Sequence, residues 1–290
     1  MTNISLDLSG KIDPLTADLL SALTEAAQKA NADFFVTGAA ARDLILEQGY
    51  GISTGRRTQD IDFGVMVNGW EVYDQLKGLL VATGHFAPER NVIHRLRYRG
   101  TLPIDIIPFG EIESPPGSVT WPPDQAIRMN VLGFRDAWKS VLIVRVGPAL
   151  TIRCVSLSGM AVLKLIAWNE RRDESPEKDI ADLALLLRNY GQAGNDERLY
   201  GDHSNWLEAE GFDLERAGAR LLGHDMAEMM NDRTQRAILD ILEREADPGT
   251  SDRLIVGVAN ELPGRDYETG EALLRCLREG IEGNRPRKTP

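Results

Sequence analysis

Two aspartates close together in the sequence have the spacing of metal-binding carboxylates. Asp60 and Asp62 lie two residues apart in the segment Thr58-Gln-Asp-Ile-Asp-Phe63, so in a strand both side chains point to the same face. Two such carboxylates repel each other unless a cation lies between them. Mg²⁺ is a hard cation that proteins hold with one or two carboxylates together with substrate phosphates. An Asp-x-Asp pair by itself is common, however, and more often lies at a solvated strand edge.

A third aspartate stands in an apolar segment further along the chain. Asp105 occupies the middle of Leu102-Pro-Ile-Asp-Ile-Ile-Pro-Phe109, where an aspartate without a partner would be costly to remove from water. It could cap a turn at the end of a strand, or it could share a metal site with Asp60 and Asp62. In the second case Asp60 and Asp62 bind Mg²⁺, with Mn²⁺ as the alternative ion, and Asp105 binds the catalytic ion and assists deprotonation of a hydroxyl nucleophile. That is the arrangement of two-metal phosphoryl transfer.

A glycine turn precedes these carboxylates and offers a place for a phosphate. The apolar run that ends at Gly38 predicts a buried strand, and a helix is expected to follow it. Gly38 allows the backbone to approach a phosphate, and the start of the helix adds partial positive charge. Arg42, one turn into that helix, could reach a triphosphate or could form an ion pair with Asp43 or Glu47. Arg57, just before the Asp-x-Asp segment, has the same two alternatives.

The order of strand, glycine turn, helix, Asp-x-Asp strand and third aspartate resembles the DNA polymerase β-like nucleotidyltransferase superfamily. The segments Thr37-Gly-Ala-Ala-Ala-Arg-Asp43 and Thr58-Gln-Asp-Ile-Asp62 correspond to its signature. Within the superfamily the sequence is most similar to the AbiEii/AbiGii toxin family of bacterial type IV toxin–antitoxin systems. The shared features are Arg56-Arg-Thr-Gln-Asp-Ile-Asp62, Val162-Leu-Lys-Leu165 and Lys178-Asp-Ile-Ala-Asp-Leu183. The likeness covers about residues 34–187.

The resemblance implies a reaction, its ligands and its partners. The reaction is transfer of a nucleoside monophosphate from an NTP to an acceptor hydroxyl, on RNA such as the 3′ end of a tRNA, or on a protein. A cognate antitoxin would neutralise the protein. The expected catalytic residues are Asp60, Asp62, Asp105 and Lys164. The expected nucleotide-binding residues are Thr37, Gly38, Ala39, Arg42, Arg57, Lys164 and Asp182, where Asp182 holds Lys164 in place.

Two features depart from the family pattern, and two other interpretations stay open. Ala39 replaces the usual second glycine or serine, so the triphosphate would depend on backbone N–H groups and nearby cations. A long loop over residues 48–59 places 21 residues between Gly38 and Asp60. Because Asp-x-Asp also binds metal in nucleotide-sugar enzymes, a glycosyltransferase is one alternative. A catalytically degenerate nucleotide-binding module, suggested by Ala39, is the other.

The hydrophobic pattern predicts a change of architecture near residue 156. Residues 1–156 mix strand and helix patterns, which predicts an α/β (α+β) nucleotidyltransferase domain with a mixed sheet flanked by helices. Helical periodicity dominates residues 157–290, which predicts a helical domain that closes the nucleotide cleft. The expected strands are 33–38, 60–67, 94–99, 102–109, 141–146 and 151–155. The expected helices are 13–30, 42–47, 69–83, 158–172, 177–189, 214–222, 226–245 and 266–279.

Composition narrows the setting in which the protein works. The net charge of −11 argues against broad affinity for nucleic acid, although Arg95, Arg97 and Arg99 alternate along one predicted strand. These three could hold an acceptor's phosphates or form a solvated strand edge. The chain shows no membrane-length apolar run and no signal peptide, and its two cysteines suit a reducing compartment, so we expect a cytoplasmic protein with no membrane partner. The four histidines show no metal-ligand spacing and receive no role.

Overall fold

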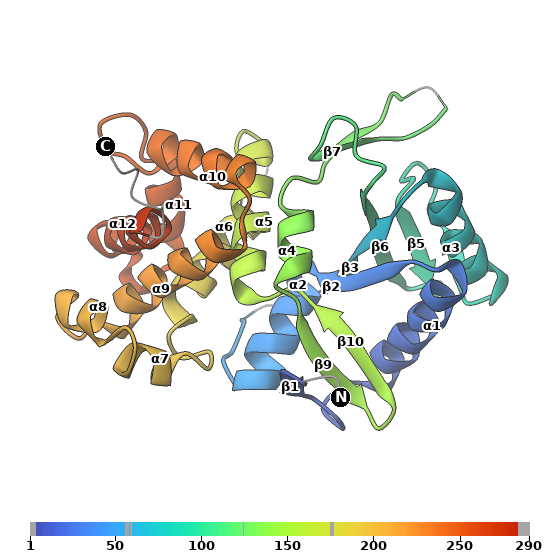
Figure 1. Cartoon of the computed structure of the whole chain (residues 1–290), viewed down its shortest axis with the longest axis horizontal. Coiled ribbons are helices and arrows are strands. Elements are labelled where there is room, and N and C mark those ends of the chain that lie inside the picture. The colour runs from blue at the N-terminus through green and yellow to red at the C-terminus, as the bar shows by residue number, and fades with distance from the viewer. Residues whose placement is uncertain (1–3, 56–57, 59, 124, 175–176, 284–290) are drawn as a thin grey trace. The chain divides into compact units, whose positions relative to one another are not determined.

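The structure is a computed structural model that describes residues 4–283, apart from 56–57, 59, 124 and 175–176 (Figure 1). The chain folds into two compact units, and the division falls between Ser156 and Leu157. Within the described residues, the named strands all belong to the first unit, and the regular elements of the second are helices. The expected fold class, a mixed sheet flanked by helices and followed by a helical region, is confirmed. No helix of the described residues is both long and apolar enough to cross a membrane.

An eight-stranded mixed sheet forms the centre of the first unit. Its strands lie in the order β1-β9-β10-β2-β3-β6-β5-β4. The pairs β3/β6, β10/β2 and β1/β9 are parallel, and the other neighbouring pairs are antiparallel. The strands are β1 Leu6–Asp7, β2 Asp33–Thr37, β3 Ile61–Val67, β4 Phe86–Pro88, β5 Arg95–Tyr98, β6 Leu102–Gly110, β9 Leu142–Gly147 and β10 Leu150–Cys154. A separate small sheet pairs β7 (Ser118–Thr120) with β8 (Arg128–Asn130).

Two helices, α1 (Pro14–Ala30) and α3 (Trp70–Ala82), pack together and cover one face of this sheet (Figure 1). The start of α1 is fixed by Asp13, whose side chain accepts a hydrogen bond from the backbone N–H of Thr16. The helix ends at Asn31, which adopts the left-handed conformation with φ of 52°. Leucines at helical spacing supply its buried side. The apolar period of α1 and its two caps therefore agree with the predicted helix 13–30.

The other face of the sheet carries an aromatic cluster. Its members are Phe35 of β2, Phe109 of β6, and Phe134 and Trp138 of α4 (Phe134–Lys139). Gly64 on β3 faces this cluster, because a Cβ at Gly64 would lie 2.4 Å from the Phe35 ring. Side chains two residues apart in a strand share a face. Asp62 therefore projects on the same side of the sheet as the aromatic cluster.

The second unit is a group of helices packed around α9 and α12. Its elements are α5 Leu157–Arg171, α6 Glu177–Asn189, α7 Asp196–Tyr200, α8 Ser204–Ala209, α9 Leu214–Met229, α10 Asp232–Glu245, α11 Arg253–Glu261, the 3-10 turn Pro263–Arg265 and α12 Tyr267–Gly283. At the crossing of α9 and α12, a Cβ on Gly223 would lie 2.0 Å from the carbonyl oxygen of Leu277. A Cβ on Gly280 would lie equally near the carbonyl oxygen of Arg220. The two glycines therefore allow the helix backbones to touch.

Several element boundaries differ from the predicted ones. The expected helix end at residue 222 is wrong, because α9 continues through Gly223 to Met229. The break falls at Asn231, whose side chain accepts hydrogen bonds from the N–H groups of Arg233 and Thr234 and so caps α10. After Gly38, α2 (Gly38–Arg42) continues as a π-helix over Asp43–Gly49, which replaces the first residues of the expected loop. Elements that the pattern did not predict are α4, α7, α8, α11, β1, β4, β7 and β8.

Candidate active site

Four neighbouring strands place one polar residue each in a single row across the sheet. Thr37 at the end of β2 is the register partner of Asp62 on β3. Asp62 is in turn the partner of Asp105 on the parallel strand β6. Asp105 is the partner of Arg95 on β5. Because register partners on neighbouring strands project from the same face, the structure brings Asp62 and Asp105 together on the face that carries the aromatic cluster.

Gly38 lies directly against the carboxylate of Asp62. It has φ of 67°, and a Cβ at this position would lie 1.9 Å from Oδ2 of Asp62. A side chain is therefore excluded twice, by the left-handed backbone and by the carboxylate. Thr37, just before the turn, is buried, and Ala39 follows in the first turn of α2. The glycine that the sequence suggested for phosphate access thus also makes room for a proposed metal ligand.

Two parallel hydrogen bonds join Asp105 to Arg95. Nε of Arg95 donates to Oδ1 of Asp105 at 2.6 Å, and Nη2 donates to Oδ2 at 2.7 Å. These hydrogen bonds hold the pKa of Arg95 above its usual range, and the charges of Asp60 and Asp62 act in the same direction. Arg95 is therefore near all three predicted carboxylates and supplies a positive charge among them.

His94 is a further residue of this site that the sequence did not indicate. Its Nε2 lies 3.9 Å from Oδ2 of Asp105, and its buried Nδ1 has no hydrogen-bond partner among the described residues. Burial lowers the pKa of His94, and Arg95 and Lys77 lower it further, against the opposing effect of Asp105. His94 is thus neutral at neutral pH. Only the pairing of β5 with β6 places it here, since the backbone N–H of Ile106 donates to the His94 carbonyl at 2.8 Å.

Asp60 precedes β3 by one residue and lies outside its hydrogen-bonded ladder. The hydroxyl of Thr58 donates to the Asp60 carbonyl at 2.8 Å and lies 3.3 Å from Oδ1 of the same residue. The predicted strand 60–67 is therefore one residue too long at its start. Although Asp60, Asp62 and Asp105 are all described, they do not form a set whose ligand oxygens all lie within 4.8 Å of one another. The three carboxylates share a neighbourhood without converging on one point.

The sequence also predicted two arginines, Arg42 and Arg57, at the nucleotide, and the structure describes only the first of them. Arg42 is buried, and its Nε and Nη2 donate to Oδ1 of Asp43 at 2.9 and 2.6 Å. Of the two alternatives for Arg42, the structure therefore shows the ion pair with Asp43. Arg57 lies outside the described residues, so its role stays a sequence prediction.

The predicted stripe of arginines is divided among separate ion pairs. Arg97 pairs with Glu89, whereas Arg95 holds Asp105. Arg99 lies after β5, in a turn where its φ is 47°, and its Nη2 lies 3.0 Å from Oδ2 of Asp18 on α1. The prediction that three arginines alternate along one strand is therefore wrong for Arg99.

In the second unit, two aspartates of α6 hold Lys164 of α5. Nζ of Lys164 lies 3.1 Å from Oδ1 of Asp179 and 2.6 Å from Oδ2 of Asp182. The side chains of the two aspartates are only 1% and 2% exposed, and Arg171 also donates to Asp179. Burial lowers the pKa of Lys164, but Asp182 and Asp179 outweigh that effect and hold the pKa above its ordinary value. The expected contact between Lys164 and Asp182 is thus present, and Asp179 is a second partner.

Comparison with known families assigns the chain. The sequence profile of the family described as "Nucleotidyl transferase AbiEii toxin, Type IV TA system" matches residues 46–254. The chain belongs to this family. The match includes Asp60, Asp62, Asp105 and Lys164, begins after the Gly38 turn, and extends beyond the expected limit at residue 187. The predicted family is confirmed, and the protein is a nucleotidyltransferase of the AbiEii family.

The solved structures that are similar to this AbiEii-family chain share little sequence with it. They include the antibiotic-resistance factor ANT(2'')-Ia, with 17% identity, a TM-score of 0.39, and coverage of 69% of this chain and 98% of that chain. An antigenic nucleotidyltransferase-like protein from Paracoccidioides brasiliensis has 16% identity, a TM-score of 0.42, and coverage of 72% and 93%. The Thermotoga maritima CCA-adding enzyme complexed with tRNA has 18% identity, a TM-score of 0.28, and coverage of 95% and 83%. A search of curated proteins finds no match. The assignment rests on the family profile.

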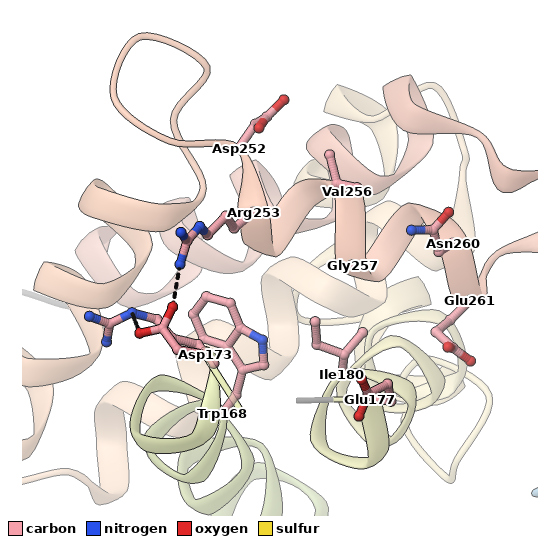
Figure 2. A pocket seen from close by; sticks show the side chains of 11 residues that line it. Trp168, Asp173, Glu177, Ile180, Asp252, Arg253, Val256, Gly257, Asn260 and Glu261 are labelled. Carbon is pink, nitrogen blue, oxygen red and sulfur yellow. Dashed lines mark hydrogen bonds and ion pairs between the residues drawn. The ribbon is translucent and has the colours of Figure 1, made fainter. Parts of the chain in front are cut away.

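The helical unit of this AbiEii-family chain has a hollow of its own. It measures about 650 Å³ and is lined by the end of α5, the start of α6, and α11. Trp168, Ile180 and Val256 give it apolar walls, and Figure 2 shows Arg253 joined to Asp173 at its rim. None of the predicted site residues lines it.

One set of possible metal ligands lies on α9. In the described part of the chain, His224, Asp225 and Glu228 are the three residues whose ligand atoms all lie within 4.8 Å of one another. Both oxygens of Asp225, however, accept hydrogen bonds from Arg198, at 2.6 and 2.7 Å, and Tyr190 donates to the same carboxylate. These contacts tie Asp225 to neighbouring helices, so we assign this set to packing.

Proposed function

We propose that the chain transfers a nucleoside monophosphate from an NTP to an acceptor hydroxyl and releases pyrophosphate, with Mg²⁺ held by Asp60, Asp62 and Asp105. The observation that carries this proposal is the register of β3 with β6, which sets Asp62 beside Asp105 on one face of the sheet. Family membership supports the class of reaction. Asp62 and Asp105 come from distant parts of the sequence, so their alignment is a property of the fold.

The donor atoms of these three residues suit a hard divalent ion. Asp62 and Asp105 offer carboxylate oxygens from adjacent strands. The charge of Asp60, like those of Asp62 and Asp105, raises the pKa of Arg95, so Asp60 lies near them. Oxygen donors of this kind bind Mg²⁺, with Mn²⁺ as the alternative ion. Such an ion, when bound, polarises a phosphoryl oxygen and lowers the pKa of a coordinated hydroxyl. The ion pair with Arg95 supports the need for a cation at Asp105.

The turn after β2 is our candidate for binding the phosphates of the NTP. Thr37 lies in the same row as Asp62, and Gly38 and Ala39 open the helical segment that follows. Backbone N–H groups at such a point can bind phosphate oxygens. Because Ala39 has no hydroxyl, this role falls to the backbone. Arg42 is engaged with Asp43, which makes it the weaker candidate.

A contact of Lys164 and Asp182 with the nucleotide is proposed from the family resemblance. Their own geometry supports a different contribution, which is the joining of α5 to α6 through a buried ion network. The two roles are compatible only if Lys164 keeps its aspartates while the nucleotide is bound.

As acceptor we propose RNA, in particular the 3′ end of a tRNA, with a protein hydroxyl as the alternative. As partner we propose a cognate antitoxin in the cytoplasm, because the family is described as a type IV toxin. The net charge of −11 means that RNA would have to bind at a local basic surface. Glycosyl transfer loses its support, since the Asp-x-Asp segment lies within the match to a nucleotidyltransferase family.

NTPs radiolabelled at different phosphates test the reaction. The purified protein is incubated with Mg²⁺, a tRNA-sized RNA fraction and an NTP labelled at either the α or the γ phosphate. We expect the α label to appear on RNA and the γ label to leave as pyrophosphate. The Asp62→Asn variant, which keeps the shape of the side chain and removes its charge, is expected to transfer no label.

Each other outcome has a definite meaning. Equal labelling by the wild type and Asp62→Asn would contradict the proposal, and γ label on the product would indicate a kinase. Label on protein instead of RNA would change the acceptor. Binding of Mg-NTP in calorimetry without transfer to either acceptor would favour a nucleotide-binding module. Expression that leaves bacterial growth unchanged, with and without neighbouring genes, would contradict the toxin role.

A further inference from the structure

The ion pair between Arg95 and Asp105 uses both oxygens of a proposed metal ligand. Nε and Nη2 of Arg95 each donate to a different oxygen of the carboxylate, at 2.6 and 2.7 Å. Paired hydrogen bonds of this geometry are the strong form of the arginine–carboxylate interaction. A divalent ion would have to use the same two oxygens. Arg95 therefore already interacts with both of the oxygens that Asp105 could offer to a metal ion.

The Arg95–Asp105 ion pair is partly buried and remains in contact with solvent. The Asp105 side chain is 12% exposed and that of Arg95 is 29% exposed, so the pair is partly shielded from water. Partial shielding makes the attraction between the charges stronger than at an open surface. The exposed part of Arg95 leaves its side chain a route toward solvent. Arg95 is therefore not enclosed by protein on every side.

We propose that Arg95 is a built-in counter-ion that competes with the divalent ion for Asp105. This inference rests on the proposed function, because it takes Asp105 to be a metal ligand. An ion that binds Asp105 must either displace the arginine from one carboxylate oxygen or bind beside its positive charge. Either way, the free protein binds the ion weakly. A nucleotide adds phosphate oxygens as ligands and adds negative charge. The ion is then held best when the nucleotide is present.

Arg97 provides a matched control on the same strand. It lies two residues after Arg95, which places the two side chains on the same face of β5. Arg97 pairs with Glu89, which directly follows the edge strand β4, and Glu89 is not one of the site carboxylates. Substitution of either arginine by alanine changes the net charge by the same amount. Only Arg95→Ala removes the hydrogen bonds to Asp105.

The test is a titration of the full-length, nucleotide-free protein with Mn²⁺, in which electron paramagnetic resonance measures the unbound ion. We expect Arg95→Ala to bind Mn²⁺ about 5- to 150-fold more tightly than the wild type, the usual range of coupling between two binding events. Arg97→Ala should change the affinity by less than about two-fold, because the Arg97 charge is paired with Glu89 and is screened by salt. Arg95→Lys should fall between, since it keeps the charge and loses the paired hydrogen bonds. Asp62→Asn should bind Mn²⁺ more weakly than the wild type.

The variants separate failure of this inference from failure of the proposed function. Mn²⁺ binding that depends on Asp62 but is unchanged or weaker in Arg95→Ala would overturn the competition and leave the metal site intact. Mn²⁺ binding that is unaffected by Asp62→Asn would overturn both. Thermal unfolding without the ion checks that the variants fold. If Arg95→Ala does not fold, Arg95→Gln and Arg95→Lys decide the question by the same ordering of affinities.

Discussion

In each of the two units a positively charged side chain pairs with buried or partly buried aspartates, and the two ion pairs differ in their exposure to solvent. In the second unit, Lys164 lies between Asp179 and Asp182, whose side chains are almost fully buried. In the first unit, Asp105 is held by Arg95, whose side chain is partly exposed to solvent. The Arg95–Asp105 pair therefore meets solvent, whereas the aspartates that hold Lys164 do not.

This difference assigns different contributions to similar residue types. A buried charge network contributes mainly to holding helices together, since breaking it leaves a charge without a partner. A partly exposed pair contributes less to stability than a fully buried one, because its charges still meet solvent. The family resemblance made both Lys164 and Asp105 candidate catalytic residues. The burial of its aspartates points to support of the fold at Lys164, whereas cation exchange at Asp105 is our proposal.

The largest effect is expected from Asp105→Asn. Loss of a metal ligand should reduce nucleotidyl transfer by about a thousand-fold, because the ion contributes several kcal/mol to the transition state. The free energy of unfolding should fall by only about 1–2 kcal/mol, because the asparagine oxygen still accepts from Arg95, whose side chain meets solvent. Radiolabel transfer and urea unfolding measure the two quantities. A loss of activity that follows a loss of folded protein would contradict this separation.

The converse is expected from Asp179→Ala in the second unit. Removal of this carboxylate leaves Lys164 and Arg171 short of a partner, and the free energy of unfolding should fall by about 3–5 kcal/mol. Asp173→Ala is the matched control, because Asp173 is exposed and pairs with Arg253 at the surface. That change should cost less than about 1 kcal/mol. If urea unfolding gives the same loss of unfolding free energy for both substitutions, burial does not make the Lys164 network more important for stability than a surface ion pair.

A smaller effect is expected from Gly38→Ala, compared with Gly51→Ala. Both glycines have positive φ, 67° and 70°, so alanine should cost each about 1 kcal/mol or somewhat more in stability. Only at Gly38 would the new Cβ meet Asp62, whereas Gly51 has nothing within 4 Å. Gly38→Ala should therefore reduce transfer by about a hundred-fold through a displaced carboxylate. Equal activity of the two variants would count against contact between Gly38 and the working form of Asp62.

The smallest effect concerns the pH response of the second unit. Lys164 has a pKa above its ordinary 10.5, so its network does not titrate near neutrality. Burial, His224 and Arg198 lower the pKa of His203 below 6.5. The unfolded chain then binds the proton more readily, and stability should fall as the pH falls through 6.5. In urea unfolding at about pH 7.5 and 5.5, His203→Gln should lose slightly less stability than the wild type. A variant as pH-dependent as the wild type would assign the response to other groups.

The sequence was most informative where one pattern decided one structure. Asp105 could be identified because it interrupts an apolar strand, where an aspartate requires a partner. Asp60 and Asp62 could be identified from their spacing along a strand. The long strands and helices followed from alternation and helical period in the same way. Strands of two or three residues, such as β1 and β7, carry too few side chains for any period to appear.

Other features depended on packing between distant segments. Gly223 looked like the end of a helix, but its contact with α12 is visible only once the helices are assembled. His94 and Arg95 entered the site because β5 pairs with β6, and nothing near them in sequence indicates that Asp105 is their neighbour. The sequence therefore indicated Asp105 and could not predict that His94 and Arg95 face it.

The register between β5 and β6 has a consequence for changes of chain length. Tyr98 pairs with Leu102, so three residues, 99–101, form the turn that aligns Arg95 with Asp105. An insertion or deletion of one residue in this turn would shift one strand by one position and point one of the two side chains to the opposite face. Substitutions that keep the left-handed backbone at Arg99 and Gly100 would leave the alignment unchanged. Related sequences that use the same pair should therefore vary in the composition of this turn and keep its length.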